Sequence, residues 1–257
     1  MHRSAPVLRH MRDFCAGFFH IEECVEAGMN EICLCHSLPC RRKTVTCLAR
    51  LRRAGERDDE ASLFRYDNRR EADGIAHAEA IMCRDRALLD ALAACEGGEL
   101  TLFLTYQPCH YSGGHRQQSK ISCTNTVIHF HEHELQPRRI SLHIRIAYVY
   151  RAHWQKEHCA AKYWPMIHAA RAGMLLLRDA GVEVSAFRAC DWKFVLACSS
   201  EAVREALRAT PLPILQRRSE FDTFMRAFLD ELNAEQPAGP APRCMECDSP
   251  CEASSTA

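Results

Sequence analysis

The amino-acid sequence predicts an α/β sandwich around a five-stranded sheet. Segments with helical periodicity alternate with short apolar or β-branched segments along most of the chain, and five of the latter are strand candidates. The last two strand candidates, 140–150 and 182–190, are separated by a stretch that contains a long helical pattern. A connection of that length permits a parallel crossover, whereas a tight hairpin joins only antiparallel strands. We therefore expect these two strands to be parallel.

The elements of the amino-terminal half follow from periodicity and turn residues. Apolar residues at steps of three and four predict a helix over 13–29. Segments 43–53 and 62–68 are rich in β-branched and aromatic residues and are joined by a charged link, which predicts a hairpin. Segment 76–95 has one apolar helical face and ends before Gly97 and Gly98, which stop helices.

The carboxy-terminal half continues the alternation of strands and helices. A wholly apolar run predicts a buried strand over 99–106, and the pattern that follows is helical. The chain is then expected to contain a strand over 140–150, a helix over 164–181, a strand within 182–197 and helices near 200–208 and 219–233. From these elements we predict three units: an N-terminal helix with a Cys-rich loop (1–40), a folded domain (41–235) and a disordered tail (236–257) rich in Pro, Gly, Ser and Ala.

Composition limits the function. The chain has 257 residues, of which 47% are hydrophobic, enough for one full core. Its 33 basic and 33 acidic residues balance, so no whole-protein field attracts nucleic acid or membrane. No run reaches the roughly 18 apolar residues of a membrane span, so we expect no membrane partner. Sixteen cysteines without an apolar signal segment indicate a reducing compartment, cytoplasmic or nuclear.

Three residues carry the chemistry of a zinc site. His77 and Glu79 open a predicted helix, and Cys109 follows a proline at the end of the next strand. This order resembles the H-x-E and P-C-x-x-C signature of the zinc deaminases, which implies a zinc site. Imidazole and thiolate ligands hold Zn²⁺ tetrahedrally and leave one position for water, which becomes a usable hydroxide near neutral pH. A carboxylate beside the ion that is not a ligand then carries the proton, and Glu79 is the candidate.

The sequence offers more than one residue as the third zinc ligand. The residues just after Cys109 include no second cysteine, and three candidates follow: Cys123, His110 and His115. Cys123 opens a helical pattern whose apolar residues at plus four and plus seven face the core, and zinc favours a soft thiolate. In that case the residues between the two cysteines form an inserted loop. In the alternative, Cys123 is a buried helical thiol and a loop histidine completes the site.

Several motifs stand in an order typical of one family. They are RRKTVTC (41–47), HAE (77–79), TYQPC (105–109), CTNTVIHF (123–130), IRIAYVY (144–150) and LLLRDAGVEVSAF (175–187). With these motifs, segment 41–197 resembles the AID/APOBEC-like polynucleotide cytidine deaminases of the zinc-dependent cytidine deaminase superfamily. The resemblance implies a cytidine-deaminase-like three-layer α/β/α sandwich around a five-stranded mixed sheet with the last two strands parallel. It also implies a hydrolase that converts cytosine to uracil in single-stranded DNA or RNA, with Zn²⁺ as cofactor.

The resemblance further implies a set of substrate-binding residues. Those expected to hydrogen-bond the target nucleotide are Thr44 and Asn68, those expected to line its pocket are Thr105 and Tyr106, and those in the place of the flanking-base reader are Tyr148 and Tyr150. We expect only one of the last two tyrosines to touch substrate, because their register also suits core packing. Tyr106 stands where the family has tryptophan, so the preference for a target base is not carried over.

Other functions and sites remain alternatives. Segment 41–70 has ten basic and five acidic residues, which suits a cationic nucleic-acid groove but equally suits solvated strand edges. The chain could also be a deaminase of free nucleosides or of tRNA adenosine, or a catalytically silent zinc or nucleic-acid-binding relative. The helix between the last two strands speaks against the free-nucleoside branch. Cysteines near 33–40 and in 244–251 could form a second zinc site or be free thiols. The choice between DNA and RNA and the oligomeric state stay open.

Overall fold

The structure is a computed structural model that describes residues 45–71, 74–111, 122–149, 152, 161–198, 201–208 and 212–235. These ranges belong to the unit predicted over 41–235. Several expectations concern residues outside them: the helix over 13–29, the Cys-rich loop, the tail beyond 236, the substrate candidates Thr44 and Tyr150, and the loop histidine His115.

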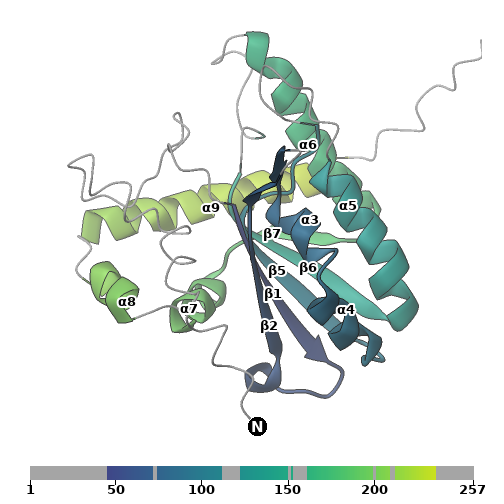
Figure 1. Ribbon diagram of the computed structural model, residues 1–257. Coiled ribbons are helices and arrows are strands. Elements are labelled where there is room, and N and C mark those ends of the chain that lie inside the picture. The colour runs from purple at the N-terminus through teal and green to yellow at the C-terminus, as the bar shows by residue number, and fades with distance from the viewer. Residues whose placement is uncertain are drawn as a thin grey trace, which may run out of the picture.

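Five strands form one mixed sheet in the order β2-β1-β5-β6-β7 (Figure 1). Strand β1 pairs antiparallel with both β2 and β5, whereas β5 with β6 and β6 with β7 are parallel. The expected α/β fold with its hairpin and its parallel last strands is therefore confirmed. The strands are β1 (Thr46–Arg53), β2 (Ser62–Asp67), β5 (Gly98–Tyr106), β6 (Ile140–Tyr148) and β7 (Glu183–Ala186).

Helices flank both faces of this sheet. Cys47 Sγ lies 3.8 Å from Met82 Sδ of α3, while the guanidinium of Arg50 lies 5.0 Å from the ring centre of Phe194 in α7. Because residues 47 and 50 of β1 point to opposite faces, α3 and α7 cover opposite sides of the sheet, as Figure 1 shows. The helices are α3 (Ala78–Met82), α4 (Arg86–Ala93), α5 (Cys123–Phe130), α6 (Trp164–Asp179), α7 (Ala189–Ala197), α8 (Glu201–Arg208) and α9 (Leu212–Ala234).

The single helix expected over 76–95 is wrong, because the structure divides it into α3 and α4. Asp85 begins α4 as its N-cap, and its carboxylate accepts hydrogen bonds from the backbone of Ala87 (3.4 Å) and Leu88 (3.3 Å). Tyr66 of β2 also donates to Asp85 at 2.7 Å. This contact with a distant strand holds the break, and apolar periodicity along the segment carries no sign of it.

A small hairpin was missed by the sequence reading. Strands β3 (Arg69–Glu71) and β4 (Gly74–Ala76) form a separate two-stranded sheet, and each has only three residues. A pattern of period two needs more residues than this to be visible. The hairpin matters for function because β4 ends immediately before His77.

A π-helical turn, η2 (His131–Leu135), follows α5. The side chain of His131 is buried, whereas His129 and His133 are exposed with ring centres 4.1 Å apart. A short 3₁₀ turn, η3 (Gln136–Arg138), follows, and strand β6 begins after it. Two further 3₁₀ turns are η1 (Asp58–Glu60) and η5 (Ala161–Tyr163).

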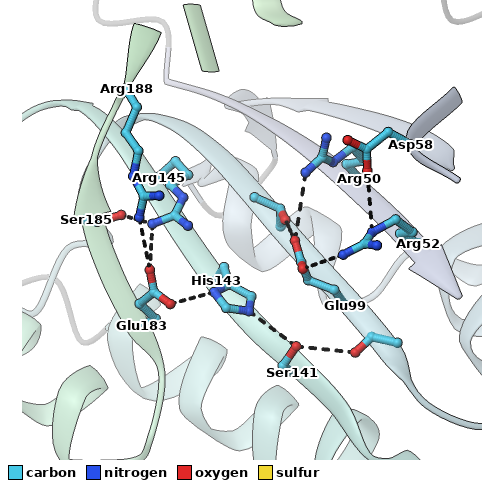
Figure 2. A network of polar contacts seen from close by, with 12 residues as sticks. Arg50, Arg52, Asp58, Glu99, Ser141, His143, Arg145, Glu183, Ser185 and Arg188 are labelled. Carbon is cyan, nitrogen blue, oxygen red and sulfur yellow. Dashed lines mark hydrogen bonds and ion pairs between the residues drawn. The ribbon is translucent and has the colours of Figure 1, made fainter. Parts of the chain in front are cut away.

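The sheet face that carries α7 is polar toward the β6–β7 edge. The Glu183 carboxylate lies 2.7 Å from Arg145 Nη1 and 2.9 Å from His143 Nδ1 (Figure 2). Glu99 similarly lies 2.9 Å from Nη2 of Arg52 on β1. Opposite charges thus neutralise one another across strands β1, β5, β6 and β7, which lowers the cost of keeping them half-buried.

Among the helices of the described residues, none combines the length and the apolar composition needed to cross a membrane.

Candidate metal centre

His77 stands at the junction between the β3–β4 hairpin and α3. It is the N-cap residue of α3, with an extended backbone (φ −79°, ψ 150°), and its side chain makes no capping hydrogen bond. The ring is therefore free to point away from the helix. Its Nδ1 lies 3.2 Å from Cys123 Sγ and 3.3 Å from Cys109 Sγ.

The two cysteines come from different elements whose ends are joined. Cys109 follows β5, and Cys123 is the first residue of α5. Between them His110 and Ser122 form an isolated antiparallel bridge, and His110 Nδ1 lies 2.9 Å from Ser122 Oγ. The backbone N–H of Thr124 also donates to the Cys109 carbonyl at 3.0 Å. These contacts bring the two thiols together although thirteen residues separate them in the sequence.

Three potential ligand atoms therefore converge. The side-chain donors of His77, Cys109 and Cys123 all lie within 4.8 Å of one another, and this group could hold a metal ion. Of the candidates that the sequence left open for the third position, the structure brings Cys123 to the group, while His110 is engaged with Ser122. Among the described residues, one imidazole and two thiols would occupy three positions of a tetrahedral metal site.

The two thiols are electrostatically distinct. The hydrogen bond with Cys123 lowers the pKa of Cys109 to about 4, and the His77 ring acts in the same direction against burial. The same hydrogen bond, together with burial, raises the pKa of Cys123. The hydrogen bond with Cys109 also raises the pKa of His77. Without a metal, the group therefore retains protons that a cation would displace.

Glu79 is the second residue of α3 and lies beside the three candidate ligands. Its side chain is 2% exposed, and burial raises its pKa to about 7, with the charge of Cys109 adding to the effect. Among the described residues, its Oε2 has no hydrogen-bond partner. A buried carboxylate oxygen without a partner is costly, and a polar group in the centre would satisfy it. Both this oxygen and the donor set fit a metal ion with a water molecule.

Two predicted substrate residues lie on the sheet face of this group. Tyr106 and Tyr148 end the neighbouring parallel strands β5 and β6, in register, with ring centres 5.8 Å apart. Tyr106 shares the face of Leu104, which is paired with Cys47, the residue that contacts α3. Both rings therefore point to the side that carries α3.

Two others are placed differently. Thr105 is buried on the opposite face, where its hydroxyl accepts from the Thr46 N–H (3.2 Å) and lies 3.4 Å from the Thr46 carbonyl. Asn68 Oδ1 accepts from the Val45 N–H at 3.1 Å and so joins the end of β2 to the start of β1. For both residues these contacts give a structural role.

The basic run 41–70 is largely paired where it is described. Arg50 and Arg52 contact Glu99, and Arg65 lies 2.8 Å from Asp67. Arg53 likewise pairs with Glu56. This part of the run therefore forms ion pairs on strands, the plainer of the two interpretations that its composition allowed.

Gly173 of α6 is a residue of the centre that sequence reasoning missed. A Cβ atom at this position would lie 2.6 Å from His110 Cβ and 2.8 Å from Thr124 Oγ1. Glycine thus lets α6 approach the two residues that follow the cysteine ligands. A glycine inside a strongly helical pattern, as in RAGMLLL, is the signal that could have indicated this close approach.

Comparison with known proteins gives no family. No protein-family model matches the chain, and no curated protein matches it.

Proposed function

We propose that this protein is a zinc-dependent deaminase of the AID/APOBEC-like kind, which converts cytosine to uracil in single-stranded DNA or RNA. The observation that carries the proposal is the convergence of His77, Cys109 and Cys123 on one point beside the unpartnered carboxylate oxygen of Glu79. Zinc held by these three side chains would supply Lewis acidity that makes water nucleophilic near neutral pH.

Glu79 is the proton carrier in this proposal. Replacing the amine of cytosine by oxygen consumes one water and releases ammonia, so a proton must travel from the water to the ring nitrogen and to the departing amine. Burial raises the pKa of Glu79 in the metal-free protein, and a carboxyl group in this place can accept a proton and return it. Its burial excludes bulk water from competing for that proton.

Two features favour a polynucleotide substrate. Strand β7 pairs parallel with β6, whereas the corresponding strands of the free-nucleoside deaminases form an antiparallel pair. Tyr106, which is partly exposed, also supplies an aromatic ring at the carboxyl end of β5 on the face of the metal centre, whereas its neighbour Tyr148 is buried. Aromatic rings are the platforms on which proteins hold single-stranded bases.

The deciding experiment combines metal analysis with a deamination assay. Purified wild-type protein is expected to contain one zinc per chain and to convert cytosine in short DNA or RNA oligonucleotides. Glu79→Gln should keep the metal and lose turnover by about 10²-fold to 10⁴-fold. Glu205→Gln, a matched change of an exposed carboxylate on α8, should leave turnover unchanged.

The same assay separates the alternatives. Activity on cytidine alone, or on adenosine in tRNA alone, would replace the proposed substrate. Zinc without turnover on any of these substrates would identify a catalytically silent relative. Full activity in Glu79→Gln would show that the proton is carried by another group.

A further inference from the structure

Two exposed apolar side chains stand close to the candidate ligands in the sequence. Tyr111 is 51% exposed and lies two residues after Cys109, and Ile75 is 56% exposed and lies two residues before His77. Large apolar side chains so exposed are few in the described part of the chain, and the others are Trp164, Leu176 and Phe224. Tyr111 is therefore an exposed aromatic ring placed close to a candidate ligand.

Two contacts hold the Tyr111 ring in position. Its centre lies 4.6 Å from that of the His110 ring, in an edge-to-face arrangement. His110 is itself bonded to Ser122 and packed under Gly173. On the other side, Asn125 Nδ2 donates to the Tyr111 hydroxyl at 3.3 Å.

The backbone at Tyr111 is unusual. Its φ is +51°, a left-handed conformation that is uncommon for residues other than glycine, asparagine and aspartate. A tyrosine kept in this conformation directs its ring in a way that an extended backbone would not. The combination of a fixed ring and half-exposed surface is what a stacking platform requires, because little side-chain entropy is lost when a planar ligand binds.

We propose that Tyr111 is the platform on which a nucleotide adjacent to the target cytosine stacks, in a substrate that is single-stranded. This inference rests on the proposed function and adds a residue to the substrate-binding surface. The exposed amide of Asn125, at the first turn of α5, lies beside the ring and offers a hydrogen bond to the edge of the stacked base. Aromatic stacking tolerates any base, whereas an amide can favour some over others.

The test measures binding of a fluorescent oligonucleotide with one cytosine, in a Glu79→Gln background that prevents turnover. Tyr111→Ala should weaken binding by about 5-fold to 100-fold, the range for loss of one stacked base. Tyr111→Phe keeps the ring and should stay close to the parent. Ile75→Ala and Phe224→Ala remove exposed apolar side chains on β4 and on α9, and neither should weaken binding as Tyr111→Ala does.

A base-deletion series distinguishes stacking from a structural role. Abasic nucleotides are placed singly on either side of the cytosine, and at one of these positions the parent and Tyr111→Ala should bind with equal affinity. A role confined to holding the loop would weaken all oligonucleotides alike. Zinc content per chain is measured for each variant, and if Tyr111→Ala loses metal, the comparison of Tyr111→Phe with Tyr111→Leu replaces it.

The outcomes for the two proposals are separable. If the wild type deaminates oligonucleotides while Tyr111→Ala binds them as tightly as the parent, the platform is wrong and the proposed function stands. The same conclusion follows if Tyr111→Ala weakens binding equally on every abasic oligonucleotide. If the wild type neither binds nor deaminates oligonucleotides, the proposed function fails and the platform fails with it.

Discussion

His110 Nδ1 lies 2.9 Å from Ser122 Oγ, and this contact closes the segment between Cys109 and Cys123 at its base. The pair lies directly next to both thiols, one residue after the first and one before the second. Closing a chain segment has an entropic cost that rises with its length. The bond between His110 and Ser122 contributes free energy that offsets this cost. His110 is thus a positioning residue for the metal centre.

His110→Ala should weaken metal binding by about 10-fold to 100-fold, the usual effect of losing a contact that orients a ligand. The measurement is a competition titration with a chromogenic zinc chelator. His168→Ala, which removes an exposed histidine on α6, is the matched control and should bind zinc as the wild type does. Equal affinity in His110→Ala would mean that the loop needs no such bond.

Gly173→Ala should destabilise the protein by about 1–3 kcal/mol, the cost of overpacking a filled site. A decrease in the free energy of unfolding would be informative, because alanine normally stabilises a helix relative to glycine by about 1 kcal/mol. Here the new methyl group would meet His110 Cβ at 2.6 Å. Thermal unfolding measures the change, and a rise in Tm would show that α6 moves away at little cost.

Metal affinity should rise with pH across the neutral range. In the metal-free protein Cys123 keeps its proton, since burial and the hydrogen bond with Cys109 raise its pKa, and the pKa of His77 is raised as well. Zinc requires the deprotonated forms, so its binding should release about one proton or more near pH 7. Calorimetry in buffers of different ionisation enthalpy counts these protons. A count of zero would mean that Cys123, the thiol that keeps its proton, is not a ligand.

The contribution of Glu79 to the stability of the metal-free protein should fall as pH rises from about 4.5 to about 7, because its pKa is raised, whereas the lowered pKa of Cys109 acts in the opposite direction. An acid with a raised pKa in the folded state binds its proton more tightly there than in the unfolded state. An increase in pH therefore favours the unfolded state. Burial, the first cause of the shift, makes the charged form costly. The contribution of Glu79 to folding stability should therefore be largest below about pH 4.5.

Glu79→Gln should remove this dependence. At pH 8, with a chelator present, urea unfolding should find the variant more stable than the wild type by a few kcal/mol, roughly 1.4 kcal/mol for each pKa unit. The difference should vanish near pH 4. Glu205→Gln changes an exposed carboxylate and should follow the wild type throughout. A wild-type advantage at pH 8 would contradict the burial of an unpaired charge.

Much of the fold could be predicted because it depends on local pattern. The apolar run of β5 and the periodicity of α6 are visible in any window of the sequence, and the length of the chain between β6 and β7 indicates their parallel pairing. The break between α3 and α4 could not be predicted, since Tyr66 on a distant strand bonds the Asp85 that begins α4. Hairpin β3–β4 escaped because its strands are too short to show a period.

The sequence by itself determined the α/β order of elements and the types of residue at the candidate centre: an imidazole at His77, a carboxylate at Glu79 and a thiol at Cys109. Only the tertiary structure decided that Cys123, and not His110, joins them, and that the Thr105 hydroxyl is bonded to the backbone of Thr46. The physical reason is that residue types and hydrophobic periods are local properties, which depend only on neighbouring positions in the sequence. Convergence depends instead on contacts between elements far apart in the chain, such as the bond of His110 with Ser122 and the approach of Gly173.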